Sequence, residues 1–147
     1  MLCELIRGLV MIRTYSDLAE LPSYIERYRY LKMGGKLGEA TFGYDRIFNQ
    51  RFYRSAEWKQ IRDHVIVRDN GCDLGVYGYE IHGKILVHHM NPLTMDDLKH
   101  GGETVLDPEF LICVTHNTHN AIHYGDENLL PLLPPERVPG DTMLWTR

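Results

Sequence analysis

The feature that most constrains this chain is a pair of adjacent histidines, His88 and His89, which follow an apolar run from Lys84 to Val87. This run predicts a β-strand, and Asn91-Pro92 ends it because proline has no N–H for a strand ladder. Neighbouring side chains of a strand point to opposite faces. The two imidazoles are therefore expected to face different parts of the fold and to have different roles.

Composition limits the setting of the protein. The 147 residues suit one domain, and no apolar run is long enough to span a bilayer, so we expect no membrane partner. Three widely spaced cysteines, Cys3, Cys72 and Cys113, argue against a disulfide framework and favour a reducing, cytoplasmic location. The absence of any C-x-x-C excludes a zinc knuckle made of thiolates.

Charge is unevenly distributed along the chain. Residues 1–71 hold twelve Lys and Arg against nine Asp and Glu, a net of +3, whereas residues 72–147 hold four against eleven, a net of −7. A nucleic-acid partner would therefore be met by the first half, and a cation would be favoured in the second.

Two amphipathic helices are predicted in the first half, within residues 21–35 and 55–71. Serines suit their N-caps, and Asn70-Gly71 suits the end of the second. The caps are Ser23 and Ser55, and the buried stripes are Ile25, Tyr28 and Leu31 in the first helix and Trp58, Ile61 and Val65 in the second.

The second half alternates between short strands and turns. We expect a hairpin around His82-Gly83, a polar loop over residues 94–106, a strand within residues 109–115 and a helix within residues 116–125, capped by Thr115 or Asn117. Together these elements predict an α+β fold.

The elements divide one structural domain into four parts. We expect a flexible N-terminal extension over residues 1–14, a helical, basic region over 15–71, a core over 72–126 and an extended, proline-rich tail over 127–147.

Two further histidines could bind the same metal ion as one histidine of the pair in the strand. His119 and His123 lie at i and i+4 of the last predicted helix, the spacing by which one helix face offers two nitrogens to one metal ion. The intervening loop and strand can bring them to the strand end, so that three imidazoles surround one cation. One histidine of the 88–89 pair would then bind the ion, and the other would be free to move a proton.

The segments "ILVHHMNPL" and "LDPEFLICVTHNTHNAIHYGD" resemble the ββα-metal motif of HNH endonucleases, over about a third of the chain. The upstream "FYRSAEWKQIRDHVIVRDNGCDLG" is similar to what precedes this motif in phage-encoded members. The resemblance implies a metal-dependent endonuclease that hydrolyses DNA phosphodiester bonds on a ββα-metal core. It also implies that His88, His119 and His123 are metal ligands and that His89 is the general base.

The resemblance implies one divalent ion. Imidazole ligands favour Zn²⁺, Ni²⁺, Co²⁺ or Mn²⁺ by softness, and the family adds Mg²⁺. Many members hold a structural zinc on two C-x-x-C pairs, but here Cys72 stands alone and Thr115 and Thr118 occupy the second pair's positions, so we expect no structural zinc.

The position of the family's middle asparagine is also changed. Phe110 stands where this residue would brace the loop of the general base, and Asn91, Asp107 or Asn117 are the residues that can compensate.

Basic residues in the first half are the candidates for DNA contact through phosphates, with a solvated helix face as the alternative. They are Arg46, Arg51, Arg54, Lys59, Arg62 and Arg68. A different interpretation of the whole chain is a metal- and DNA-binding module that does not cut, or an accessory factor of a phage packaging complex in the host cytoplasm.

Overall fold

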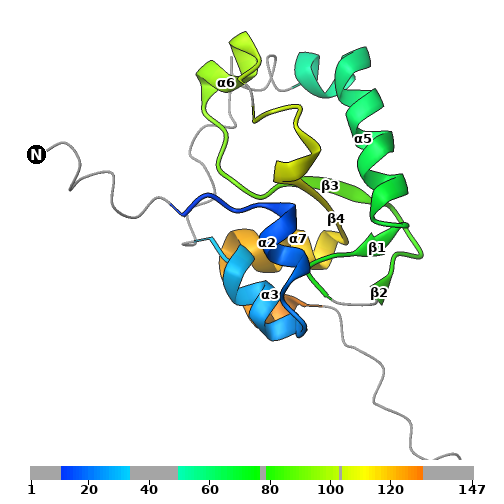
Figure 1. Ribbon diagram of the computed structural model, residues 1–147, viewed down its shortest axis with the longest axis vertical. Coiled ribbons are helices and arrows are strands. Elements are labelled where there is room, and N and C mark those ends of the chain that lie inside the picture. Colours follow the sequence, from blue (N-terminus) through cyan, green and yellow to red (C-terminus); the bar gives the residue numbers. More distant parts are fainter. Residues whose placement is uncertain (1–10, 34–49, 77–78, 103, 131–147) are drawn as a thin grey trace, which may run out of the picture.

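The centre of the fold is an antiparallel pair of strands, β3 (Leu86–His89) and β4 (Leu111–Val114), drawn in Figure 1. The computed structural model describes residues 11–33, 50–76, 79–102 and 104–130. Helices and short antiparallel strands are mixed along these residues, which confirms the predicted α+β class. None of the described helices combines the length and the apolar character that crossing a membrane requires.

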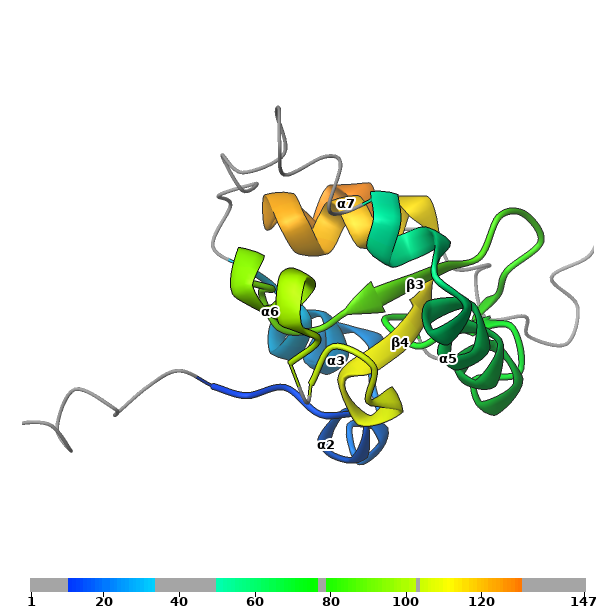
Figure 2. The same ribbon diagram turned by 90° about the horizontal axis from the view of Figure 1, so that it is seen from above.

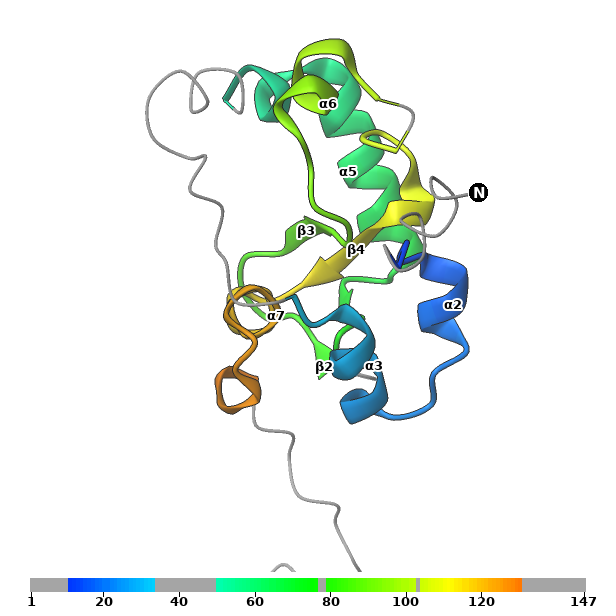
Figure 3. The ribbon, with the colours of Figure 1, turned by 90° about the vertical axis from the view of Figure 1, so that its left-hand side faces the viewer.

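Strand β4 is buried on both faces, as its unbroken apolar sequence predicts. Ile112 and Val114 pack into one cluster with Leu18, Leu31 and Ile122, whereas Leu111 and Cys113 pack into another with Trp58 and Val65. The strand therefore separates two cores. Helices α5 (Ala56–Arg68) and α6 (Met95–His100) lie on one side, and α3 (Tyr24–Leu31) and α7 (His116–Tyr124) lie on the other (Figure 3).

The capping signals of the sequence hold in the structure. Ser23 and Ser55 cap α3 and α5, each accepting a bond from a backbone N–H in the first turn, and Asn70 and Gly71 take positive φ just beyond α5. The stripe residues Trp58 and Val65 are buried. Helix α2 (Tyr15–Ala19), which the sequence analysis did not predict, is capped by Thr14 and buries Leu18 against the first core.

The predicted hairpin around His82-Gly83 is wrong. Strand β2 (Tyr79–Glu80) pairs with β1 (Cys72–Asp73), whereas β3 pairs with β4, about two dozen residues further along the chain. Strand β3 also begins later than predicted, at Leu86, and includes both His88 and His89. The residues before the turn belong to the β1–β2 sheet, and those after it belong to the β3–β4 sheet. Strand β3 pairs with β4 because β4 is fully buried.

The predicted polar loop over residues 94–106 contains α6. Thr94 caps it through a reciprocal capping box with Asp97, and Gly101 ends it with a φ of 65°. Shorter pieces of 3₁₀-helix, η1 (Pro108–Phe110) and η2 (Glu127–Leu129), flank β4 and α7.

The two terminal predictions fall largely outside the described residues. Of the extension predicted over residues 1–14 only 11–14 are described, and Arg13 donates its backbone N–H to Asn91 and its guanidinium to the Tyr30 carbonyl. Residues before the predicted boundary therefore contribute to the fold. Of the tail predicted over 127–147, only 127–130 are described.

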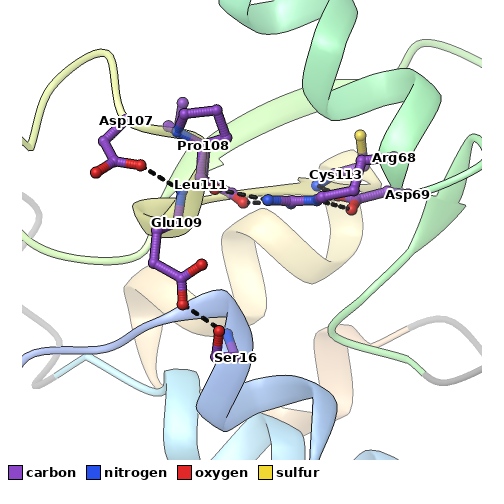
Figure 4. A network of polar contacts seen from close by, with 8 residues as sticks. All are labelled: Ser16, Arg68, Asp69, Asp107, Pro108, Glu109, Leu111 and Cys113. Carbon is purple, nitrogen blue, oxygen red and sulfur yellow. Dashed lines mark hydrogen bonds and ion pairs between the residues drawn. The ribbon is translucent and has the colours of Figure 1, made fainter.

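Arg68, predicted as a DNA contact, is a structural residue instead. Its guanidinium forms an ion pair with the buried Asp69, at 2.7 Å, and donates to the carbonyls of Pro108 and Leu111 (Figure 4). Asp69 in turn accepts from the backbone N–H of Cys113, at 2.8 Å. These bonds fasten α5 to η1 and β4, and they occupy all three guanidinium nitrogens.

We expect Arg68→Ala to lower the free energy of unfolding by about 3 kcal/mol, because removing one partner leaves a buried carboxylate unpaired. Urea unfolding measures this value. Lys59→Ala, on an exposed position of the same helix, is the matched control and is expected to change stability little. Equal losses in the two variants would contradict the structural role of Arg68.

Candidate metal centre and flanking histidine

His88 and His89 face the two different cores, as strand alternation predicts. The ladder places His88 opposite Ile112, whose side chain belongs to the core shared with α7, and places His89 opposite Leu111, whose side chain belongs to the core shared with α5. Both imidazoles are buried. Helix α7 lies across β3 on the His88 side, visible above the strands in Figure 2.

Helix α7 supplies the two other imidazoles. Thr115 caps its N-terminus and Gly125 ends it with a φ of 67°, so that the helix spans two and a half turns. His119 and His123 lie one turn apart on the face toward β3. Their rings lie 5.2 and 5.1 Å from the ring of His88, centroid to centroid, and 4.3 Å from each other.

The three predicted ligands therefore converge. One nitrogen from each of His88, His119 and His123 lies within 4.8 Å of the others, close enough for a single metal ion. The donor set fits an ion: Nε2 of His88 is buried, and among the buried side-chain polar atoms of the described residues it alone has no hydrogen-bond partner. A ligand atom without a protein partner is what an imidazole needs in order to coordinate.

The electrostatics keep these imidazoles neutral. Burial holds the pKa of His88 well below its usual value, and repulsion from His123 and His119 acts in the same direction. Burial also lowers the pKa values of His119 and His123. Neutral imidazole is the form that binds metal, so the lone pairs are available at neutral pH.

His89 lies in an aromatic pocket on the opposite side. Its ring stacks on Trp58, with centroids 5.2 Å apart and planes 21° apart, and the rings of Phe52 and Tyr53 lie 6.1 and 6.4 Å away. Burial lowers the pKa of His89, although the hydrogen bond to Val105 acts in the other direction. The imidazole is therefore neutral at neutral pH and can accept a proton.

The carbonyl of Val105 fixes the orientation of His89. It lies 2.9 Å from Nε2, and a carbonyl only accepts, so this nitrogen carries the hydrogen and Nδ1 carries the lone pair. Sequence reasoning missed Val105 because a contact through the backbone has no residue-type signal.

Three residues were predicted to brace the loop of His89 in place of Phe110. Two of them bond to other residues, and the third is exposed. The side chain of Asn91 exchanges two bonds with the backbone of Arg13, and Asp107 accepts from Glu109 at the start of η1. Asn117 is exposed on α7.

The basic residues divide into three groups. Arg51, Arg54 and Lys59 are exposed, and Arg62 is partly exposed beside Asp63. Arg46 lies outside the described residues, and Arg68 is half-buried with its guanidinium bonded within the protein. Arg51 and Arg54 flank Phe52 and Tyr53 in the sequence, so these two exposed arginines belong to the segment that contacts His89.

Comparison with known proteins gave no relatives. No protein-family model matches the chain, and neither the curated proteins nor the solved structures contain a match.

We expect Zn²⁺ or Co²⁺ to raise the melting temperature of the protein, since an ion that binds only the folded state adds about 2.7 kcal/mol at one hundred times its dissociation constant. Differential scanning calorimetry with and without EDTA measures the shift. His119→Ala should abolish it. His116→Ala, on the same helix but outside the cluster, should retain it. Loss of the shift in both variants would contradict the assignment of the ligands.

Proposed function

We propose that the protein is a metal-dependent endonuclease of the HNH type, which hydrolyses DNA phosphodiester bonds. The observation that carries the proposal is the arrangement of four imidazoles, three converging on one point and the fourth held on the other face of the same strand. The succession of β3, β4 and α7 supports a ββα-metal core within residues 72–126.

In this proposal His89 activates water. Val105 leaves Nδ1 of His89 as the proton acceptor, and the stacked Trp58 holds the ring in place while water attacks phosphorus. His88, His119 and His123 hold the ion through neutral nitrogens. A divalent ion bound there supplies positive charge against the charge that grows on the phosphate and on the leaving 3′ oxygen. By resemblance to the family, the products carry 5′-phosphate and 3′-hydroxyl ends.

The three ligands limit which metal ions the site would prefer. Three imidazoles and no carboxylate favour Zn²⁺, Ni²⁺, Co²⁺ or Mn²⁺ by softness, and Mg²⁺ enters through the resemblance. With one ligand cluster among the described residues, we propose catalysis with one ion.

DNA is held through its phosphates in this proposal. Arg51, Arg54, Lys59 and Arg62 are at least partly exposed along the segment that precedes and forms α5. This segment contacts His89 through Phe52, Tyr53 and Trp58, so bound DNA would lie beside the proposed base. Arg46 remains a predicted contact.

A second function has one observation in its favour. Phe110 occupies the position of the family's bracing asparagine, which suits a module that binds metal and DNA, or serves a phage packaging complex, without cutting. A plasmid nicking assay with Mg²⁺, Mn²⁺, Zn²⁺ and Ni²⁺, against an EDTA control, separates the two functions. Metal-dependent conversion of supercoiled to relaxed or linear DNA supports the nuclease, and no conversion with any ion supports the module.

We expect His89→Ala to lower the rate of plasmid cleavage by about a hundredfold or more, while metal binding is unchanged. His88→Ala should abolish both, because it removes a ligand. Cleavage is followed on plasmid and binding by metal titration. Wild-type cleavage by His89→Ala would refute the base assignment.

We expect Arg54→Ala and Arg62→Ala to weaken binding to all DNA sequences alike and to flatten the dependence of affinity on salt, since each lost phosphate contact lowers the slope of log K against log salt by about 0.9. Fluorescence anisotropy at several salt concentrations measures the slope. Glu57→Gln, on an exposed position of the same helix, is the control and should not flatten it. Affinities equal to wild type at every salt concentration would exclude these contacts.

A further inference from the structure

The carboxylate of Asp73 connects β1 to the helix that carries two of the three clustered histidines. Asp73 is completely buried, and its Oδ1 accepts from the backbone N–H of Gly75 at 2.9 Å. Its Oδ2 accepts from the backbone N–H of Thr115 at 2.9 Å and from the hydroxyl of Thr118 at 2.5 Å. One side chain thus binds the N-cap residue and the first turn of α7 from a segment more than forty residues away.

The contact between the two segments is tight. Thr118 is fully buried, and a Cβ atom placed on Gly75 would lie 2.6 Å from its methyl group. The hydroxyl of Thr115 also donates to Thr118, at 3.0 Å, so both threonines belong to one network. This network leaves the first turn of α7 little freedom to rotate or slide.

The residues that bond to Asp73 are neighbours of the clustered histidines in the sequence, but they are not themselves members of the cluster. His119 follows Thr118 directly, and His123 lies one turn further along the same helix. His88, in contrast, is placed by β3. The convergence of the three imidazoles therefore depends on how α7 is rotated against β3, and metal ligands must be held within roughly 10–20° of their working geometry.

We propose that Asp73 is a positioning residue for the metal centre, which fixes the rotation of α7 through Thr115 and Thr118. The inference rests on the metal-binding part of the function proposed above. It assigns a role to a residue that touches neither the ion nor the substrate and does not require the protein to cleave DNA.

Asp73→Asn is the sharpest substitution, because it keeps the shape of the side chain. A carboxylate has two acceptor oxygens, and the backbone N–H groups of Gly75 and Thr115 each use a different one. An amide has one acceptor oxygen, so in either orientation its NH₂ group must face a backbone N–H. Either the first turn of α7 or the Gly75 turn that carries Asp73 must then shift, and in both cases the position of the side chain against α7 changes.

Asp69→Asn is the matched control. Asp69 is the other buried aspartate among the described residues, and it also accepts from a backbone N–H, that of Cys113. Its bonds fasten α5 to β4, neither of which carries a clustered histidine. A variant that only loosens the fold should resemble Asp69→Asn.

The experiment is a titration with Co²⁺, followed by its visible absorption, together with urea unfolding without metal. We expect Asp73→Asn to weaken Co²⁺ binding by about tenfold or more and to change the shape of the absorption band. Asp69→Asn should keep the wild-type affinity within about twofold and the wild-type band, even where the two variants lose similar stability. Wild-type affinity and band in Asp73→Asn, or equal loss of affinity in both variants, overturns the proposal.

A second pair of variants applies if Asp73→Asn does not fold. Thr118→Ser keeps the hydroxyl that donates to Asp73 and should bind Co²⁺ as wild type, whereas Thr118→Val keeps the shape, loses the hydroxyl and should bind more weakly. Equal affinities of the serine and valine variants overturn the proposal.

The same titration separates this inference from the proposed function. Wild-type protein that binds Co²⁺ but does not cleave plasmid refutes the nuclease and leaves the role of Asp73 to be decided by the variants. Wild-type protein that binds no Co²⁺ refutes the metal centre and the role of Asp73 with it.

Discussion

The alternation of side chains along β3 is the constraint on which the site depends. Two adjacent residues of a strand cannot face the same way, so His88 and His89 are assigned to different sides of the sheet by backbone geometry alone. What makes this alternation useful is β4, whose own residues alternate between two buried clusters. Each histidine therefore has different neighbours: His88 lies beside two further imidazoles, and His89 stacks on Trp58.

Local signals predicted α3, α5 and α7, because a cap and a stripe act within one turn, whereas α2 was not predicted. Ser23, Ser55 and Thr115 cap the helices that the sequence predicts, and the spacing of His119 and His123 placed both on one face. Helix α6 was missed although its capping box, Thr94 with Asp97, is legible in the sequence.

Long-range choices were less accessible to sequence reasoning. The apolar alternation around His82-Gly83 is equally compatible with a hairpin and with two separate pairings, and only the burial offered by β4 decides between them. Arg68 appears among basic residues on a predicted surface helix, yet its partner Asp69 is buried. Val105 acts through its carbonyl, and Asp73 through threonines more than forty residues away, so neither has a pattern in the sequence. The sequence analysis singled out Thr115 and Thr118 because they stand in place of cysteines of the resembled motif, and in the structure both donate hydrogen bonds to Asp73.

The buried polar groups differ in how far the fold satisfies them. Asp69 and Asp73 each accept several hydrogen bonds, so their burial is compensated within the protein. Nε2 of His88 has no such partner, and an unsatisfied buried polar atom costs about 1–3 kcal/mol. A chain selected for stability alone would replace His88 by an apolar residue that fits the same core. The cost is recovered if an ion completes the cluster, because binding to the folded state alone adds to stability. The one place in the described residues where the fold leaves a buried side-chain polar atom unsatisfied is thus the place where three imidazoles converge, as expected of residues that could hold a metal ion.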